Sequence, residues 1–445
     1  MRERYRVILP IIVFAMLLLL AGGCDLLPGG EFLGLPLTQA TPRPTETPAV
    51  VQPTATPEQE EPEEIEEEQP AVETLLVWVP PFMDPDSDSD AGRLLSAQLD
   101  LFEALHEDVN VVVRVKAETG SASLVESLVS TSAVAPLELP SLVVLGRRDM
   151  ENVARRGLIL PLGDYSNIIN ELDWFQYGRT ISVISESSYG LPLVGESLVM
   201  VVRSTEFTGL ANNWASFIEA ETPVGFLAND PQATQVLLYY LALEGRLVDD
   251  DNQLVLDETL LTQVYTVFAE VAAAGIIPEE VTEASSFEAL WDGFLVGNYP
   301  MVIVPSTFAL QEKPADTFVI PVTPITNYDY TLGRGWMLAL ADPLPERREL
   351  AVELAEVLAD GRFTGPWSQA LGYLPMRRVA LDLWGSSTQV QRYSAISLSA
   401  NPYPSIEIIN QVGPILQEGL LAVLNQTLSA EEAAAAAAAK LPLED

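Results

Sequence analysis

From Thr74 onward the chain alternates short, β-branched apolar runs with longer stretches of helical periodicity. Thr74–Val79, Asn110–Val115 and Ser141–Leu145 have the length of buried strands, and helical patterns over Gly92–His106 and Leu124–Ser130 separate them. Buried strands that alternate with helices are typical of a parallel sheet covered by helices. In such sheets ligands bind beyond the carboxyl ends of the strands. The sequence therefore predicts an α/β fold with its functional residues in the loops after the strands.

A second series of the same kind begins near Tyr189. Further strands are expected at Ser197–Val202, Gly225–Leu227, Met301–Val304 and Leu338–Leu340, and further helices at Gln235–Leu243, Leu260–Ala274 and Pro345–Asp360. The run from Ser429 to Glu432 is a capping box, which predicts a final alanine-rich helix. A chain of 445 residues is longer than one hydrophobic core normally serves, so we expect two lobes or domains.

The composition excludes several classes of function. Acidic residues outnumber basic ones by 63 to 23, and the net charge of −40 repels phosphates, which argues against nucleic-acid binding. The only histidine is His106 and the only cysteine is Cys24, so intrachain disulfides and Cys/His metal clusters are impossible. We expect no metal and no cofactor. Chemistry that uses carboxylates alone stays open.

The N-terminus has the pattern of an export signal. Arginines precede the apolar run Val7–Ala21, which is shorter than the ~20 residues that span a bilayer. A single-pass anchor is the alternative. Leu20-Ala21-Gly22-Gly23-Cys24 resembles a bacterial lipobox. This resemblance implies that residues 1–24 are a signal peptide, that Cys24 carries lipid, and that the protein is anchored on the outer face of the cytoplasmic membrane.

Residues 25–73 have the composition of a stalk. Thr41–Pro57 contains five threonines and five prolines, and Glu58–Glu68 contains eight glutamates. Neither stretch can bury a core, so we expect both to be disordered. Proline-rich chain extends by about 3.1 Å per residue, and such a stalk could hold a domain up to ~100 Å from the membrane. The sequence predicts a globular domain over residues 74–445.

Several segments of this domain match one family in the same order. They are the first strand with its tryptophan (LLVWV), Leu139–Leu162, Tyr189–Val202 (YGLPLVGESLVMVV), Phe287–Val304 (FEALWDGFLVGNYPMVIV), Gly333–Leu340 (GRGWMLAL), Glu349–Leu358 with Gln369–Pro375 (QALGYLP), and Leu421–Leu441. Together with the lipobox and stalk, they resemble the extracellular solute-binding proteins of ABC transporters, family 1, the sugar-binding class that includes maltose-binding protein.

The resemblance implies a two-lobed clamp of the type II periplasmic binding-protein kind, in which each lobe is a helix-covered, mostly parallel sheet. Lobe one would comprise about 74–192 and 332–376, and lobe two about 193–331 and 377–445. A sugar or polyol would bind between the lobes and pass to the permease subunits of an ABC transporter. We expect a monomer and no enzymatic activity. The chain has no Gly-Lys dipeptide and hence no P-loop, so ATP hydrolysis belongs to a partner.

Sugar recognition requires apolar faces that stack on pyranose rings and planar polar groups that bind hydroxyls. Trp78 ends the first strand, where its ring can overhang a ligand; packing in the core is the alternative. Arg148 and Asp149 follow the third strand, where related proteins hold a charged pair on sugar hydroxyls. The order of the two charges is reversed here, and a surface ion pair is the alternative.

The resemblance also implies ligand contacts where the chain crosses between the lobes. Glu196 lies at the first crossover, next to the apolar run Leu198–Val202, and needs a partner. That partner is either the ligand or an arginine. Arg334 and Trp336 lie at the second crossover and are candidates for the same site.

Lobe two contributes the remaining candidates. Asp230 and Gln232 follow the strand at 225–227, where a relative has an acid-Pro-aromatic element. Ser306 and Thr307 stand where many relatives have a tryptophan, which suggests a ligand different from maltodextrins. Trp291 lies on an apolar helical face, and we expect it in the core.

Other interpretations remain open. Four aspartates alternate over Asp84–Asp90, but the glycine and glutamate of an EF-hand calcium loop are missing, so a solvated loop is expected. A secreted glycosidase would need two carboxyl groups beside the scissile bond, and no motif marks such a pair. A sensor or adhesin lipoprotein that is not coupled to transport is the third alternative.

Overall fold

The computed structural model describes residues 72–441. The predicted signal peptide, Cys24 and the stalk up to residue 71 lie outside this range. Among the described residues, no helix combines the length and the apolar character that crossing a membrane requires.

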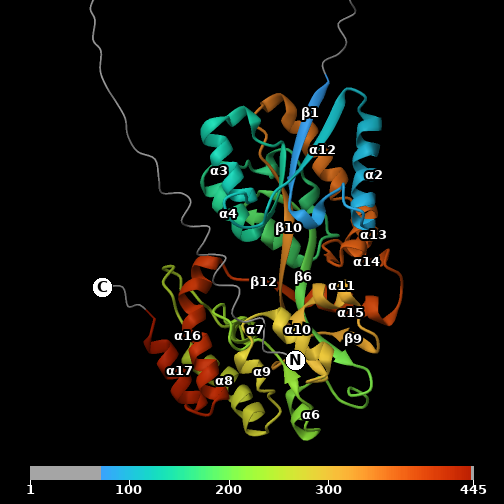
Figure 1. Ribbon diagram of the computed structural model, residues 1–445. Coiled ribbons are helices and arrows are strands. Elements are labelled where there is room, and N and C mark those ends of the chain that lie inside the picture. Colours follow the sequence, from blue (N-terminus) through green and yellow to red (C-terminus); the bar gives the residue numbers. More distant parts are fainter. Residues whose placement is uncertain (1–71, 442–445) are drawn as a thin grey trace, which may run out of the picture. The chain divides into compact units, whose positions relative to one another are not determined.

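The first three predicted strands are present and lie side by side. β1 (Glu73–Val79) pairs in parallel with β2 (Val109–Val115) and with β3 (Leu142–Gly146). These strands continue into one larger sheet with the order β2-β1-β3-β10-β6-β8-β7 (Figure 1). We call the part built on β1, β2 and β3 lobe one.

Two long strands connect this part to the rest. β6 (Gly190–Arg203) and β10 (Thr331–Leu340) pair antiparallel, and β10 also pairs antiparallel with β3. The first half of β6 pairs with β10 and β11 (Leu374–Pro375), whereas its second half pairs with β8 (Met301–Pro305) and β9 (Thr317–Ile320). We call the part built on β7 (Val224–Gly225), β8 and β9 lobe two, and β6 and β10 the crossover strands. β6 and β10 run antiparallel to each other, and β10 runs antiparallel to β3. The sheet therefore contains both parallel and antiparallel pairs.

Helices cover both sides of the lobe-one strands, as expected for this class. Figure 1 shows α3 (Leu124–Val134) and α4 (Arg147–Arg155) on one side, and α2 (Asp90–Leu105), α12 (Arg348–Leu358) and α13 (Gly361–Leu371) on the other. Side-chain caps define two of the starts, because Ser89 accepts the N–H of Gly92 and Ser123 accepts the N–H of Glu126.

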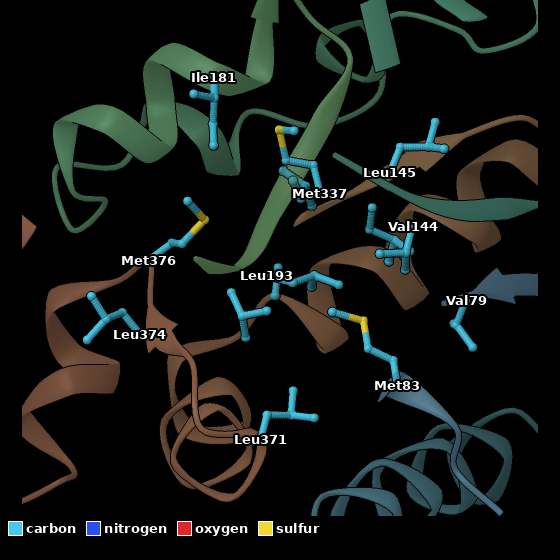
Figure 2. Close-up of a cluster of buried hydrophobic side chains, with 14 of the residues drawn as sticks. Val79, Met83, Val144, Leu145, Ile181, Leu193, Met337, Leu371, Leu374 and Met376 are labelled. Carbon is cyan, nitrogen blue, oxygen red and sulfur yellow. The ribbon is translucent and has the colours of Figure 1, made fainter. Parts of the chain in front are cut away.

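The core of lobe one joins segments that lie far apart in the sequence. Figure 2 shows Val79, Val144, Leu193 and Met337, from four strands, converging with Leu371 at the end of α13. All five are buried. Burial of side chains of this size contributes about 1.5–3 kcal/mol each, so this core ties the first crossover strand firmly to lobe one.

Lobe two has two apolar layers, which follow from the alternation of side chains along β6. Leu198, Met200 and Val202 pack in a cluster with helices α7 (Thr234–Ala242), α8 (Glu258–Ala273), α16 (Ile406–Leu424) and α17 (Ala430–Ala439). Val199 and Val201 point the other way and share a cluster with α10 (Phe287–Val296), including the buried Trp291. The core position expected for Trp291 is therefore confirmed.

The remaining elements are short. They are α5 (Gln176–Ser182), β4 (Val183–Ile184), β5 (Ser187–Ser188), α6 (Trp214–Glu219), α9 (Glu280–Glu283), α11 (Ser306–Glu312), α14 (Arg378–Asp382), α15 (Thr388–Ser399), β12 (Ala400–Pro402) and 3-10 turns at Pro81–Met83, Pro136–Glu138, Leu162–Asp164, Ile168–Asn170 and Pro345–Arg347. The predicted capping box opens α17, with Ser429 and Glu432 bonded reciprocally. α14 packs on α13.

Candidate ligand-binding site

The two crossover strands bring Glu196 and Arg334 face to face. They are direct neighbours in the register of β6 and β10, and the Nε–H of Arg334 donates to Oε1 of Glu196. The hydroxyl of Thr307, on α11, donates to Oε2 of Glu196 at 2.7 Å. The Glu196 side chain is 12% exposed and that of Arg334 is 61% exposed. The sequence predicted either the ligand or an arginine as the partner of Glu196. The structure supplies an arginine, Arg334, which is also one of the predicted site residues.

The opposite face of the crossover strands has no side chains at the same level. A Cβ atom at Gly195 would lie 2.7 Å from the Tyr177 hydroxyl, and one at Gly335 would lie 2.4 Å from Cε of Met376. Only glycine permits such close packing. Tyr177 and Met376 therefore support the strands from behind, and the charged pair is confined to one face.

Three aromatic side chains from separate segments lie together beside the sheet. The rings of Phe82 and Tyr373 are stacked, with centroids 5.1 Å apart and an angle of 17° between their planes. Trp336, on β10, meets Phe82 edge to face at 5.2 Å. All three are only partly buried. We call Phe82, Trp336 and Tyr373 the aromatic platform; such ring pairs contribute about 0.5–1.5 kcal/mol beyond their buried area.

Electrostatics place the platform close to the charged pair. Burial, followed by the negative charges of Glu196 and Glu118, raises the pKa of the Tyr373 phenol, and the charge of Arg334 opposes this rise. Burial also raises the pKa of Tyr403, where Arg334 lowers it and Glu196 raises it. The charge of Glu196 is in turn the main cause that raises the pKa of Arg334. Both phenols thus stay neutral at physiological pH and keep an O–H that can donate.

Ser306 lies next to this group but does not face solvent. Its side chain is fully buried, and its hydroxyl accepts the backbone N–H of Ser197 at 3.3 Å. It therefore fastens α11 to β6 and thereby helps to place its neighbour Thr307 against Glu196.

Asp230 is held by its own loop. Its two carboxylate oxygens accept the backbone N–H groups of Gln232 at 2.9 Å and of Thr234 at 3.0 Å, and the residue is 7% exposed. Its charge still reaches the phenol of Tyr403, whose pKa it raises. Gln232 is exposed on the same loop. These bonds make Asp230 first of all the residue that shapes the turn before α7.

The lobe-one candidates lie at or just after the ends of two strands, and the end of β3 lies opposite Trp336 in its register with β10. Arg148 and Asp149 form the first turn of α4, directly after β3, and burial raises the pKa of Asp149 while the charge of Arg148 lowers it. Trp78 is 2% exposed and belongs to the lobe-one core, with the ammonium of Lys116 4.6 Å from its ring centroid. This burial agrees with core packing, the alternative interpretation, and a ligand contact of Trp78 stays a prediction.

The structure thus brings together Glu196, Arg334 and Trp336 from the predicted set. Tyr373 and Tyr403 were not predicted from the sequence, and Phe82 was included only as part of the loop Pro80–Asp90 after the first strand. A signal for them exists, because each is an aromatic residue in a loop rich in proline or glycine (PPF, LGYLP and NPYP), where packing alone does not require a ring.

The aspartate loop is organised by local bonds. Oδ1 of Asp84 accepts the N–H of Asp86 at 2.9 Å, and Asp90 pairs with Arg93 in the first turn of α2. The helix begins at Asp90, two residues before the predicted start at Gly92.

Comparison with known families decides the class of protein. Residues 86–360 match the family described as bacterial extracellular solute-binding protein, which is more than half of the chain. The chain belongs to this family. No curated protein matches this solute-binding protein in sequence.

Solved structures show the same fold. The sugar-binding protein MalE from Xanthomonas citri superposes with a TM-score of 0.67 at 16% identity, covering 83% of this chain and 96% of that one. The GacH receptor of Streptomyces glaucescens has a TM-score of 0.60 at 17% identity, covering 82% and 96%. The cyclic α-maltosyl-1,6-maltose binding protein of Arthrobacter globiformis has a TM-score of 0.65 at 14% identity, covering 82% and 97%. These similarities confirm the predicted two-lobed α/β fold.

Proposed function

We propose that this solute-binding protein captures a saccharide against the crossover strands and delivers it to an ABC permease. The observation that carries the proposal is the placement of the Glu196–Arg334 pair beside the aromatic platform. The similar structures support it, since they include proteins named for binding sugars.

The chemistry of the site suits a sugar ring. A pyranose has an apolar face of C–H groups, which an aromatic face such as that of Trp336 or Tyr373 covers well. Its hydroxyls both donate and accept, so a carboxylate and a guanidinium side by side can bind neighbouring hydroxyls. Hydrogen bonds to charged groups contribute roughly 1.5–3 kcal/mol each. The neutral phenols of Tyr373 and Tyr403 add further donors.

The position of the pair suits a clamp. Glu196 and Arg334 lie on the strands that join the lobes, Phe82 comes from lobe one and Thr307 from lobe two. A ligand bound here contacts groups that a hinge movement displaces relative to one another. Its binding energy therefore favours one arrangement of the lobes, which is the signal that a permease can recognise.

The test is a thermal-shift screen of the full-length protein in detergent against neutral sugars and polyols, followed by calorimetry of each hit. A ligand at about 100 times its dissociation constant adds about 2.7 kcal/mol to the stability and should raise the melting temperature visibly. Glu196→Ala should reduce the shift, because the ligand then lies closer to its dissociation constant. If a sugar binds this variant with unchanged affinity, its binding site does not include Glu196.

We also propose that the protein binds without catalysis, as a monomer. Incubation with oligosaccharides should release no new reducing ends, and the mass in solution should be that of one chain. New reducing ends would favour the glycosidase alternative.

The anchor is a further part of the proposal. Cys24, as the only cysteine and at the end of a lipobox-like run, would carry the lipid that holds the receptor on the outer face of the membrane. A Cys24→Ser protein expressed in a bacterial host should lose its membrane association. Unchanged processing and fractionation would contradict the lipid anchor and leave the ligand site unaffected.

A further inference from the structure

We propose that the Glu196–Arg334 pair acts as a charge filter, which makes the site select neutral saccharides over saccharides that carry a carboxylate, such as uronates. This inference rests on the proposed function and deepens it, because it names the class of saccharide. Glu196 is the residue that determines the selection.

The first argument is the state of Arg334. Within residues 72–441, its Nε–H is the only one of its N–H groups with a protein partner, and the side chain is 61% exposed. An uncompensated guanidinium with free N–H groups is the preferred partner of a carboxylate, which it binds with two parallel hydrogen bonds. Glu196 cancels that charge. Arg334 can then donate to hydroxyls without attracting an anion strongly.

The second argument is that Glu196 is fixed in place. Its other oxygen accepts the hydroxyl of Thr307 at 2.7 Å, and its side chain is only 12% exposed. Thr307 is itself held because its neighbour Ser306 is fully buried and bonded to the N–H of Ser197. An acidic ligand cannot displace Glu196 from Arg334 without leaving this carboxylate buried beside a second negative charge.

The third argument is the charge around the site. In addition to burial, the charges of Glu196 and Glu118 raise the pKa of Tyr373, and that of Arg334 lowers it. Burial and the charges of Glu196 and Asp230 likewise raise the pKa of Tyr403. Besides Glu196, two further acids therefore act on the side chains around the pair. An added carboxylate is repelled by these acids, and a close contact between like charges near a protein surface corresponds to about a tenfold or greater loss of affinity.

The experiment compares matched sugars that differ only by a C6 carboxylate. Suitable pairs are glucose with glucuronate, galactose with galacturonate, and maltotriose with its C6-carboxylated form, each titrated calorimetrically into the full-length protein in detergent. The wild type should bind the neutral member at least about tenfold more tightly. Glu196→Gln keeps the size of the side chain and an oxygen for Thr307 but removes the charge, so the preference should fall by about tenfold or reverse.

Glu418→Gln is the matched control. Glu418 forms an ion pair with Lys440 between α16 and α17, with side chains 67% and 45% exposed, and its replacement changes the net charge by the same amount. This variant should keep the wild-type preference. High salt should weaken the preference of the wild type, because it screens charges but leaves selection by shape unaffected.

The outcomes are distinguishable. Equal affinity of the wild type for both members of a pair, or an unchanged preference in Glu196→Gln, overturns the charge filter and leaves the saccharide receptor intact. A wild-type protein that binds no member of any pair, and no sugar in the wider screen, overturns the proposed function and this inference with it. A melting curve of Glu196→Gln verifies that the variant is folded.

Discussion

Lobe one places aromatic rings beside the crossover strands, whereas lobe two supplies side chains that carry oxygen atoms. Phe82 and Tyr373 present ring faces next to Trp336, while Thr307 and Asp230 present oxygen atoms. A ring face stays available to a ligand as long as it is partly exposed. A polar group is available to a ligand only if its hydrogen-bonding atoms are not already bonded to its own loop. Exposure therefore decides whether an aromatic residue can bind the ligand, whereas existing hydrogen bonds decide whether a polar residue can.

Glu196 and Asp230 illustrate this on the polar side. Both are acids close to the crossover, and both were predicted as ligand contacts. Both oxygens of Asp230 accept backbone N–H groups that come from its own turn. The partners of Glu196 are side chains from two other elements, β10 and α11. The bonds of Asp230 therefore stabilise its own loop, whereas those of Glu196 link β6 to β10 and α11.

The largest effect is expected for Glu196→Ala. The change removes a charged acceptor and leaves Arg334 unpaired, so the affinity for the saccharide found in the screen should fall about ten- to a hundredfold, or roughly 1.4–3 kcal/mol. Calorimetry measures the affinity, and a circular-dichroism melt of the unliganded protein verifies the fold. An unchanged affinity would remove the charged pair from the site.

Loss of the aromatic platform should have the next largest effect. Tyr373→Ala removes a stacked ring, and the affinity should fall about five- to tenfold, or ~1–1.4 kcal/mol. Tyr373→Phe is the control, since it keeps the ring face and loses only the hydroxyl; it should retain most of the affinity. Equal losses in both variants would show that the hydroxyl, and not the ring face, binds the ligand.

Asp230→Ala should affect stability more than binding. Two backbone N–H groups of the turn before α7 lose their acceptor, which costs about 1–2 kcal/mol and lowers the melting temperature by a few degrees. The affinity should change by less than about threefold. A loss of affinity as large as that of Glu196→Ala, without a change in melting temperature, would restore Asp230 as a ligand contact.

The smallest effect is expected for the ion pair between the lobes. Arg155 at the end of α4 and Glu407 at the start of α16 are 2.6 Å apart, with side chains 61% and 46% exposed. Exposed pairs are weak and screened by salt, so Glu407→Gln should speed ligand release by at most about fivefold, and only at low salt. Stopped-flow measurements in a double-mutant cycle with Arg155→Gln isolate the coupling.

The pH dependence of this pair has a definite sign. The hydrogen bond from Arg155 is the main cause that lowers the pKa of Glu407 below its ordinary value. The contribution of the pair is therefore present above the ordinary pKa of a glutamate and is lost as the pH falls through the lowered one. Ligand release from the wild type should approach that of Glu407→Gln in this acidic range, and a difference that persists below it would contradict the assignment.

Local patterns in the sequence were sufficient for much of the fold. Apolar runs of β-branched residues predicted β1, β2, β3 and β8, and the capping box at Ser429 predicted α17, because strand patterning and helix capping depend on residues close together in the chain. The crossover strands were predicted only in part. Pro192, Gly195 and Glu196 interrupt the apolar pattern of β6, and these residues are tolerated there because neighbouring strands from both lobes pair along its whole length.

The sequence by itself determined the α/β class, the resemblance to solute-binding receptors and the candidates Glu196, Arg334 and Trp336. Only the tertiary structure decided which candidates meet. Phe82 and Tyr373 are almost 300 residues apart and stack only because α13 packs against α2 and brings the loop after it next to β1. Trp78 and Asp230 have the residue types of ligand contacts, yet one is buried in the core and the other is bonded to its own turn. Availability for a ligand depends on which neighbours the fold supplies, and those neighbours are distant in the chain.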